Sequence, residues 1–171
     1  MKVTKKSNLE TNTGHRFISK TKTCYKIHIH TPNDEILNRS VGFIKIGEVR
    51  GLKKAIFLRN EIGCAMWGKH WKRVLHDPTI FTRLPHSLEP KLIEKPCPTK
   101  SNPDQTRPYY IAKWLEYDEN GSSTYKSKLT NVTAMGKLAA YSQAKRILLE
   151  AHAQNIDILL FMGRVNTLKL K

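Results

Sequence analysis

Basic side chains recur at alternate positions in short segments of this chain, where they could contact the phosphates and bases of a nucleic acid. Lys26, His28 and His30 alternate with apolar residues, and this period of two predicts a strand with one packed face and one outward polar face. The planar fork of Arg39 matches the O6 and N7 acceptors of guanine. Arg39, Lys126 and Lys128 are expected to project outward, as Lys26 and His28 do. The predicted contact residues are Arg16, Lys20, Lys22, Lys26, His28, His30, Arg39, Lys100, Arg107, Lys113, Lys126 and Lys128.

The charge of the whole chain favours a polyanionic partner. The chain has 30 Lys and Arg against 14 Asp and Glu, which gives a formal net charge of +16, and such a balance is typical of nucleic-acid binding. We assign Lys20, Lys22, Lys126 and Lys128 to phosphates, because a lysine ammonium positions a protein on the backbone without reading sequence. No apolar stretch approaches the roughly 18 residues of a spanning helix, and no apolar run of a secretory signal follows Met1. We expect double-stranded DNA as the partner, no membrane, and a cytoplasmic, nucleoid-associated protein.

Other chemistries are less well supported. His28 and His30, with Cys24 or His15, resemble part of a zinc site, but no second pair of ligands follows at a suitable spacing. The acidic residues are scattered, and the chain has no glycine-rich phosphate loop or nucleophile motif. We therefore predict a protein without metal, cofactor or catalytic residues. The cysteines, which are odd in number and far apart, are predicted to be free thiols.

A plan of strands followed by a helix occurs twice, in units of about 45 residues that run from Tyr25 to Met66 and from Tyr109 to Ala151. The first unit is predicted to contain three antiparallel strands and a helix. The expected strands and helix are 15–19, 24–30, 39–44 and 52–66. The second unit is predicted to repeat this arrangement with elements at 91–95, 109–114, 124–129 and 136–151. The fold class is therefore α+β, with two modules of a three-stranded antiparallel sheet packed on one helix.

Turn and boundary signals complete the second unit. Asn120-Gly121 predicts a hairpin turn, and Thr133 is the expected N-cap of the second helix. Trp114 alternates with the packed set. The apolar run 156–162 fits either a further strand or a closing segment, and the sequence does not decide between them.

The expected domains are a flexible arm at 1–14, a first module at 15–68, a linker at 69–90 and a second module at 91–171. The linker is stiffened by proline. Trp67, Trp71 and Phe81 are too apolar for a free tether, so we expect the linker to pack partly on one module.

Two groups of residues resemble a known DNA-binding family. In the first unit these are Lys45-Ile46-Gly47, Gly51–Ile56 and Arg59–Ile62; in the second they are Tyr110–Trp114, Gly121, Lys126, Lys128 and the helix from Gly136 to Arg146. Together they cover about half the chain, and they resemble the Apetala-two/ethylene-response-factor domain in its bacterial and phage form. This resemblance implies that the sheet, and not the helix, enters the DNA major groove. The family's outward Arg and Trp positions hold Lys26, His28 and His30 in one unit and Ile111, Lys113 and Leu115 in the other.

These observations together predict a tandem, sequence-specific double-stranded DNA-binding protein. Its expected role is a transcriptional regulator of a bacterium, a phage or another mobile element. Three alternatives stay open: a DNA-targeting accessory of a mobile-element nuclease or integrase, a basic RNA-binding protein, and an inhibitor that acts by binding another protein.

Overall fold

The computed structural model describes residues 11–118 and 122–165 and has the α+β class predicted from the sequence. The chain divides into two compact units, Met1–Phe81 and Thr82–Lys171. The division falls inside the short helix α3 (Ile80–Arg83). Each unit contains one three-stranded antiparallel sheet, so the prediction of two sheets with helices is confirmed.

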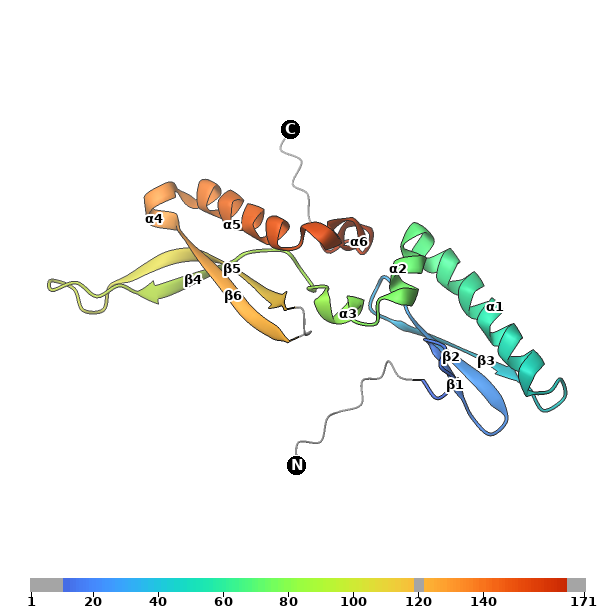
Figure 1. Ribbon diagram of the computed structural model, residues 1–171. Coiled ribbons are helices and arrows are strands. Elements are labelled where there is room, and N and C mark those ends of the chain that lie inside the picture. The colour runs from blue at the N-terminus through green and yellow to red at the C-terminus, as the bar shows by residue number, and fades with distance from the viewer. Residues whose placement is uncertain (1–10, 119–121, 166–171) are drawn as a thin grey trace, which may run out of the picture. The chain divides into compact units, whose positions relative to one another are not determined.

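The first sheet has the order β1-β2-β3, formed by β1 (Ile18–Lys20), β2 (Cys24–His30) and β3 (Ile36–Gly42). Helix α1 (Glu48–Trp67) lies along one face of this sheet (Figure 1). The strand β3 begins three residues earlier than Arg39, and α1 begins four residues earlier than Leu52. Pairing of Ile36 with His30 extends β3, and the hydrogen bond from the Gly51 amide to the Gly47 carbonyl begins the helix before Leu52.

Small residues let α1 approach the first sheet closely. Ile27 and Ile29 of β2 are completely buried, and Gly51 and Ala55 of α1 are buried in the same core. A Cβ atom on Gly51 would lie 2.6 Å from the Cβ of Phe43, which is too close for two carbon atoms. A glycine is therefore needed at position 51 for the backbone of α1 to pack where it does.

The last residues of the expected flexible arm, 11–14, are ordered against the first sheet. Residues 11–14 are tied to the sheet, because the side-chain amide of Asn12 donates to the carbonyl of Lys20 and its oxygen accepts from the Lys20 amide at 2.7 Å. Residues 1–10 of the predicted arm lie outside the described residues. After α1, the chain continues as a 3₁₀ turn (Gly68–His70) and α2 (Trp71–His76).

The first part of the predicted linker is helical and packs within the first unit. Trp67, Trp71 and Ile80 are almost completely buried. The Trp71 ring stacks on Phe17 at 5.8 Å, and the Phe81 ring lies 4.9 Å from that of His30. Burial of these large rings stabilises the helical segment against the sheet, so the expected packing of Trp67, Trp71 and Phe81 on one module is confirmed.

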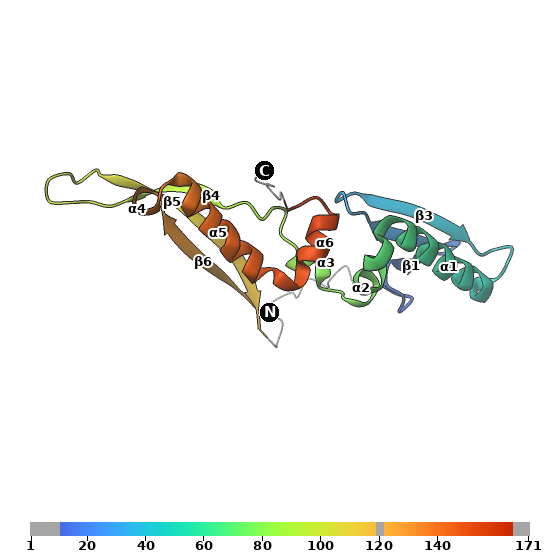
Figure 2. The same cartoon turned by 90° about the horizontal axis from the view of Figure 1, so that it is seen from above.

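The second sheet repeats the arrangement of the first. Its order is β4-β5-β6, formed by β4 (Lys91–Pro96), β5 (Thr106–Tyr117) and β6 (Ser123–Asn131). Helix α5 (Lys137–Ala151) covers one face (Figure 2). Ala140 and Ala144 of α5 are completely buried, and their small side chains let the helix lie close to the sheet. The predicted turn residues Asn120 and Gly121 lie outside the described residues.

The helix N-cap in the second unit differs from the prediction. The side chain of Asn131, and not Thr133, accepts hydrogen bonds from the amides of Thr133 and Ala134. Asn131 thereby caps the short helix α4 (Val132–Met135), which Gly136 separates from α5 through a positive φ of 81°. Asparagine and threonine are both good caps, and the end of β6 at Asn131 decides which of them holds the cap position.

The open question about residues 156–162 is answered by a helix. A 3₁₀ turn (Ala153–Asn155) leads into α6 (Ile156–Phe161), in which Ile158 and Leu159 are completely buried. This segment closes the core of the second unit and does not add a strand. Nearby, the guanidinium of Arg164 donates to the carbonyls of Leu84 and Pro85, which fastens the start of the unit to its end.

Candidate nucleic-acid interface

The strand register separates the first sheet into a helix-covered face and an uncovered face. Residues directly opposite each other on paired strands share a face. Lys26 pairs with Ser19 on one side and Ser40 on the other, and His28 pairs with Asn38. All these positions alternate with the buried residues of β2, so they lie on the face away from α1. We call this surface the first outward face; its strand residues are Ser19, Cys24, Lys26, His28, His30, Ile36, Asn38, Ser40 and Gly42.

Two predicted contact residues of the first unit lie on the opposite side. Arg39 pairs with the buried Ile27, and Lys20 pairs with the buried Tyr25. The expectation that Arg39 projects outward with Lys26 is therefore wrong, because β3 runs in a register that puts Arg39 on the α1 side of the sheet. Arg39 stays exposed only because β3 is an edge strand.

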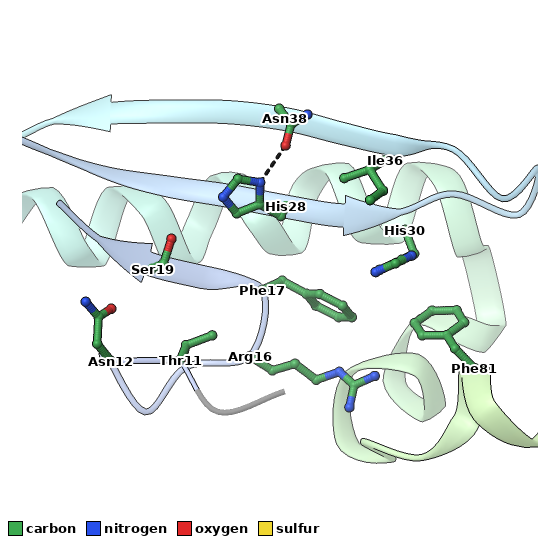
Figure 3. A pocket seen from close by; sticks show the side chains of 10 residues that line it. All are labelled: Thr11, Asn12, Arg16, Phe17, Ser19, His28, His30, Ile36, Asn38 and Phe81. Carbon is green, nitrogen blue, oxygen red and sulfur yellow. Dashed lines mark hydrogen bonds between the residues drawn. The ribbon is translucent and has the colours of Figure 1, made fainter. Parts of the chain in front are cut away.

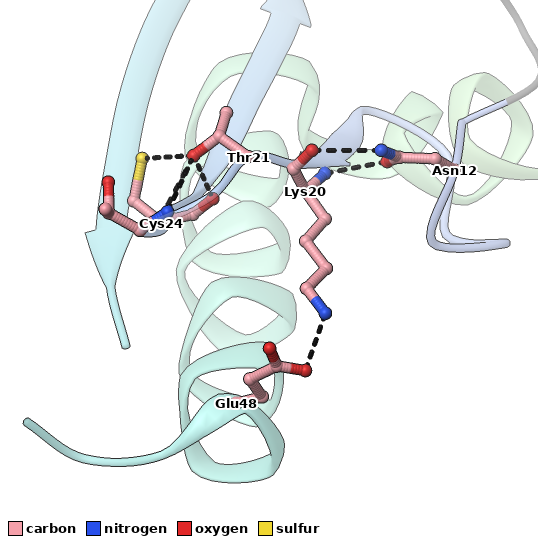
Figure 4. Close-up of polar contacts among 6 residues, drawn as sticks. Asn12, Lys20, Thr21, Cys24 and Glu48 are labelled. Carbon is pink, nitrogen blue, oxygen red and sulfur yellow. Dashed lines mark hydrogen bonds and ion pairs between the residues drawn. The ribbon is translucent and has the colours of Figure 1, made fainter. Parts of the chain in front are cut away.

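Lys20 is held by a carboxylate at the start of α1. Its ammonium donates to Glu48 at 2.6 Å (Figure 4). This hydrogen bond is the main cause of a raised Lys20 pKa. The pair is solvent-exposed and contributes little to stability, but it places a negative charge beside a lysine that was expected to bind phosphate.

The second sheet has an outward face of the same kind. Lys91 pairs with Ile111, Lys95 with Arg107, and Lys113 with Ser127. These positions alternate with Tyr110 and Ala112, which are buried under α5. We call this surface the second outward face; its strand residues are Lys91, Ile93, Lys95, Arg107, Tyr109, Ile111, Lys113, Leu115, Tyr117, Ser123, Tyr125, Ser127, Leu129 and Asn131.

The predicted outward position of Lys126 and Lys128 is wrong. Lys126 pairs with Trp114, and Lys128 pairs with the buried Ala112, so both lie on the α5 side of the edge strand β6. Lys126 is also 3.4 Å from the carboxylate of Glu116. Trp114 lies on the packed side, as its alternation predicted.

Strand carboxylates are absent from both outward faces, although cations lie on both sides of each sheet. The acidic residues of the second sheet's strands, Glu94 and Glu116, pair with Pro108 and Thr124 on the α5 side. The strands of the first sheet contain no Asp or Glu. Among the described strand positions, both outward faces therefore carry cations without a single carboxylate, and the first also carries His28 and His30. This pattern produces a positive potential on each uncovered face.

The two outward faces differ in polarity. The first presents imidazole, amide, hydroxyl and ammonium groups, including a hydrogen bond from the His28 ring to the amide oxygen of Asn38. The second is richer in apolar and aromatic groups: Tyr125 is 67% exposed, and the Lys113 ammonium lies 4.4 Å from the centre of its ring. An exposed aromatic ring beside a cation can contact bases or thymine methyl groups.

The other predicted residues are distributed around these faces. Lys22 lies exposed in the turn between β1 and β2, and Lys100 lies exposed in the loop between β4 and β5. Arg107 belongs to the second outward face. Lys91 and Lys95 were missed as contact residues, although their alternation within 91–95 was a usable signal.

Arg16 precedes β1 and lies beside a cavity on the outward side of the first sheet. Its guanidinium stacks on the ring of Phe17 at 4.7 Å and is 5.9 Å from that of Phe81. Burial lowers the pKa of His30, and the positive charge of Arg16 lowers it further. The neutral form of His30 is therefore favoured, which restricts its role as a cation on this face.

The described part of the chain contains neither a candidate metal site nor a helix that could span a membrane. Within residues 11–118 and 122–165, no three His, Cys, Asp or Glu side chains come together in a way that could hold a metal ion. Cys24, Cys64 and Cys97 are free thiols. None of the helices in these residues combines the length and apolarity needed to cross a membrane.

Comparison with known proteins does not assign the chain to a family. It matches no family model, no curated protein and no solved structure. The resemblance to the Apetala-two/ethylene-response-factor domain therefore stays a hypothesis.

Proposed function

We propose that this chain binds double-stranded DNA through the two outward faces and acts as a transcriptional regulator of a bacterium, a phage or another mobile element. The observation that carries the proposal is that the uncovered faces hold Lys, Arg and His without a strand carboxylate, whereas Glu94 and Glu116 lie on the helix side of the second sheet. A narrow antiparallel sheet fits the B-DNA major groove. The proposed activity is binding and not catalysis. Binding to DNA would place the protein at the nucleoid.

Two modules on one chain increase apparent affinity. When one outward face is bound, the second is held at a high effective concentration near neighbouring DNA. The first face offers polar groups for base edges, and the second offers Tyr125 and Ile111 beside cations. Loss of one face is therefore expected to weaken binding by more than its own contacts.

The decisive experiment measures duplex binding by fluorescence anisotropy for Lys26→Ala and a matched control, Lys53→Ala. Lys26 lies on the first outward face, whereas Lys53 is exposed on α1, which covers the opposite face. Both variants lose one positive charge, so a general charge effect would weaken them equally. We expect Lys26→Ala to lower affinity several-fold and Lys53→Ala to leave it close to wild type. Equal losses, or no duplex binding by the wild-type protein, would reject the proposal.

A second candidate, binding of single-stranded nucleic acid, is favoured by one observation. The exposed Tyr125 ring, with Lys113 beside it, offers a surface on which an unpaired base could stack. Competition between duplex DNA, single-stranded DNA and RNA of equal length separates the candidates. Preference for the duplex supports the first proposal, and preference for a single strand supports the second.

A further inference from the structure

A cavity of about 640 Å³ lies on the outward side of the first sheet (Figure 3). It is lined by side chains from the segment before β1, from β2 and β3, and by Phe81. The lining is mixed and contains no carboxylate. Phe17, Ile36 and Phe81 supply apolar surface. Among the polar residues, Asn12, Ser19, His28 and Asn38 lie at one part, and Arg16 and His30 lie at the other (Figure 3). A cavity of this size is typical of sites for small molecules. We call it the Arg16 pocket.

Arg16 is a buried cation without a hydrogen-bond partner. Its Nε, Nη1 and Nη2 atoms are all buried, and none makes a hydrogen bond. Asp77 acts on Arg16 only through its charge, which partly offsets the lowering of the Arg16 pKa by burial. The phenyl rings of Phe17 and Phe81 hold the guanidinium through its faces, and these contacts do not satisfy its N–H groups.

A second arginine of the same unit, Arg59, has a guanidinium whose three nitrogens all donate hydrogen bonds. Arg59 of α1 is also buried, but its Nε and Nη2 donate to Asn60, and its Nη1 donates to the backbone carbonyl of Arg16 at 3.1 Å. Arg59 therefore stabilises the backbone at Arg16 while its own donors are occupied. Buried polar groups in native proteins nearly always have partners, so the unpaired donors of Arg16 indicate a ligand that completes them.

We propose that the Arg16 pocket binds a phosphate group. The guanidinium fork would donate two parallel hydrogen bonds to phosphate oxygens, the geometry in which arginine recognises oxyanions. An entering phosphate would draw the fork away from the rings into the cavity, where the His30 ring supplies a further polar group. Two sources offer this chemistry, a DNA backbone phosphate and a free nucleotide. The inference does not depend on duplex binding, because a phosphate alone is sufficient to occupy the pocket.

The test is a titration of the full chain with sodium phosphate, followed through the NMR signals of the His30 ring, with sodium chloride at equal ionic strength as the reference. The variants are Arg16→Gln and a control, Arg39→Gln, which loses the same charge on the helix side of the sheet. We expect phosphate, but not chloride, to shift the His30 signals in wild type and Arg39→Gln. Arg16→Gln should weaken phosphate binding about tenfold or more.

Further arms with a deoxynucleoside 5′-monophosphate and with duplex DNA identify the source. A loss of duplex affinity in Arg16→Gln assigns the pocket to the backbone, whereas a loss confined to the mononucleotide assigns it to a free ligand. Equal responses of wild-type His30 to phosphate and chloride overturn the inference, even if Arg16→Gln does not fold. Equal phosphate affinity in wild type and a folded Arg16→Gln does so as well. Duplex binding without a phosphate response rejects only the pocket, and a phosphate response without duplex binding rejects only the proposed function.

Discussion

Gly63 of α1 packs directly against the indole ring of Trp71, so closely that a Cβ atom at position 63 would lie 2.2 Å from Cε2 of that ring. Trp71 in turn stacks on Phe17, beside the Arg16 pocket. A single absent side chain thus allows α2 to fold back onto α1 and to complete the core of the first unit. This contact holds the segment after α1 against the helix.

Replacement of Gly63 by alanine is expected to destabilise the first unit. The added methyl group overlaps a ring that is itself buried, and overpacking of this kind costs about 1–3 kcal/mol or more. Urea unfolding followed by tryptophan fluorescence measures the change. Cys64→Ala is the control, because Cys64 is an exposed neighbour on the same helix. An unchanged unfolding midpoint in Gly63→Ala would show that Trp71 does not pack as described.

Lys113→Ala is expected to reduce the salt dependence of duplex binding. If Lys113 of the second outward face neutralises one phosphate, its loss lowers the slope of log affinity against log salt by about 0.9. Titrations at several salt concentrations measure the slope. Lys137→Ala removes a charge from the exposed start of α5 and should leave the slope unchanged. A slope that is the same in wild type and Lys113→Ala would remove Lys113 from the interface.

Stability is expected to fall as the solution is acidified through the histidine range. Burial lowers the pKa of both His30 and His152 from the ordinary value of 6.5. Below pH 6.5 the unfolded chain therefore binds more protons than the folded chain, and protonation favours unfolding. Thermal unfolding between pH 7.5 and about 5.5 tests this. His30→Gln should flatten the decline, whereas His76→Gln, which replaces an exposed histidine, should retain it. A decline of the same size in His30→Gln would contradict the assignment.

A partly buried polar cluster is expected to stabilise the second unit. Glu89, in the segment before β4, accepts hydrogen bonds from Tyr141 and Lys145 of α5. Glu89→Gln should cost about 1–2 kcal/mol, since it removes a charge-assisted pair at a partly shielded site. Glu150→Gln is the control, because the Arg146–Glu150 pair is about 70% exposed at each side chain. Equal effects of the two substitutions in urea unfolding would argue against the cluster.

The same cluster gives a pH dependence at both ends of the scale. Burial alone would raise the pKa of Glu89, but its hydrogen bonds to Lys145 and Tyr141 lower the pKa overall. The stabilisation that ionised Glu89 contributes to the fold is therefore present above pH 4.5 and is lost as the pH falls through the lowered pKa. The hydrogen bond to Glu89 raises the Tyr141 pKa to about 12 from 10.0. The stabilisation that protonated Tyr141 contributes to the fold is present below pH 10 and is lost as the pH rises toward 12. Tyr141→Phe should remove the alkaline component and weaken the acid one, which Lys145 still supports; an unaltered alkaline profile in this variant would exclude Tyr141 as its source.

The sequence alone determined the class and the order of the strands and the two long helices. Alternation in β2 and β5 predicted their packed sides, and the glycines and alanines of the later segments predicted helices that lie close to a sheet. These features are local, because a period of two or of 3.6 residues depends only on residues that are close together in the sequence. The free cysteines and the exposed Lys26, His28 and Lys113 follow from the same reasoning.

Only the tertiary structure decided which cations share a face. Arg39, Lys126 and Lys128 lie on edge strands whose sequences show weak alternation, and their sides depend on the register with the central strands. A shift of one residue in that register would transfer each of them to the other face. The helical packing of Trp71 and the unpaired burial of Arg16 also depend on residues distant in sequence. Periodicity identifies the surfaces of a strand, but long-range pairing and packing determine where an edge-strand charge or an isolated buried cation lies.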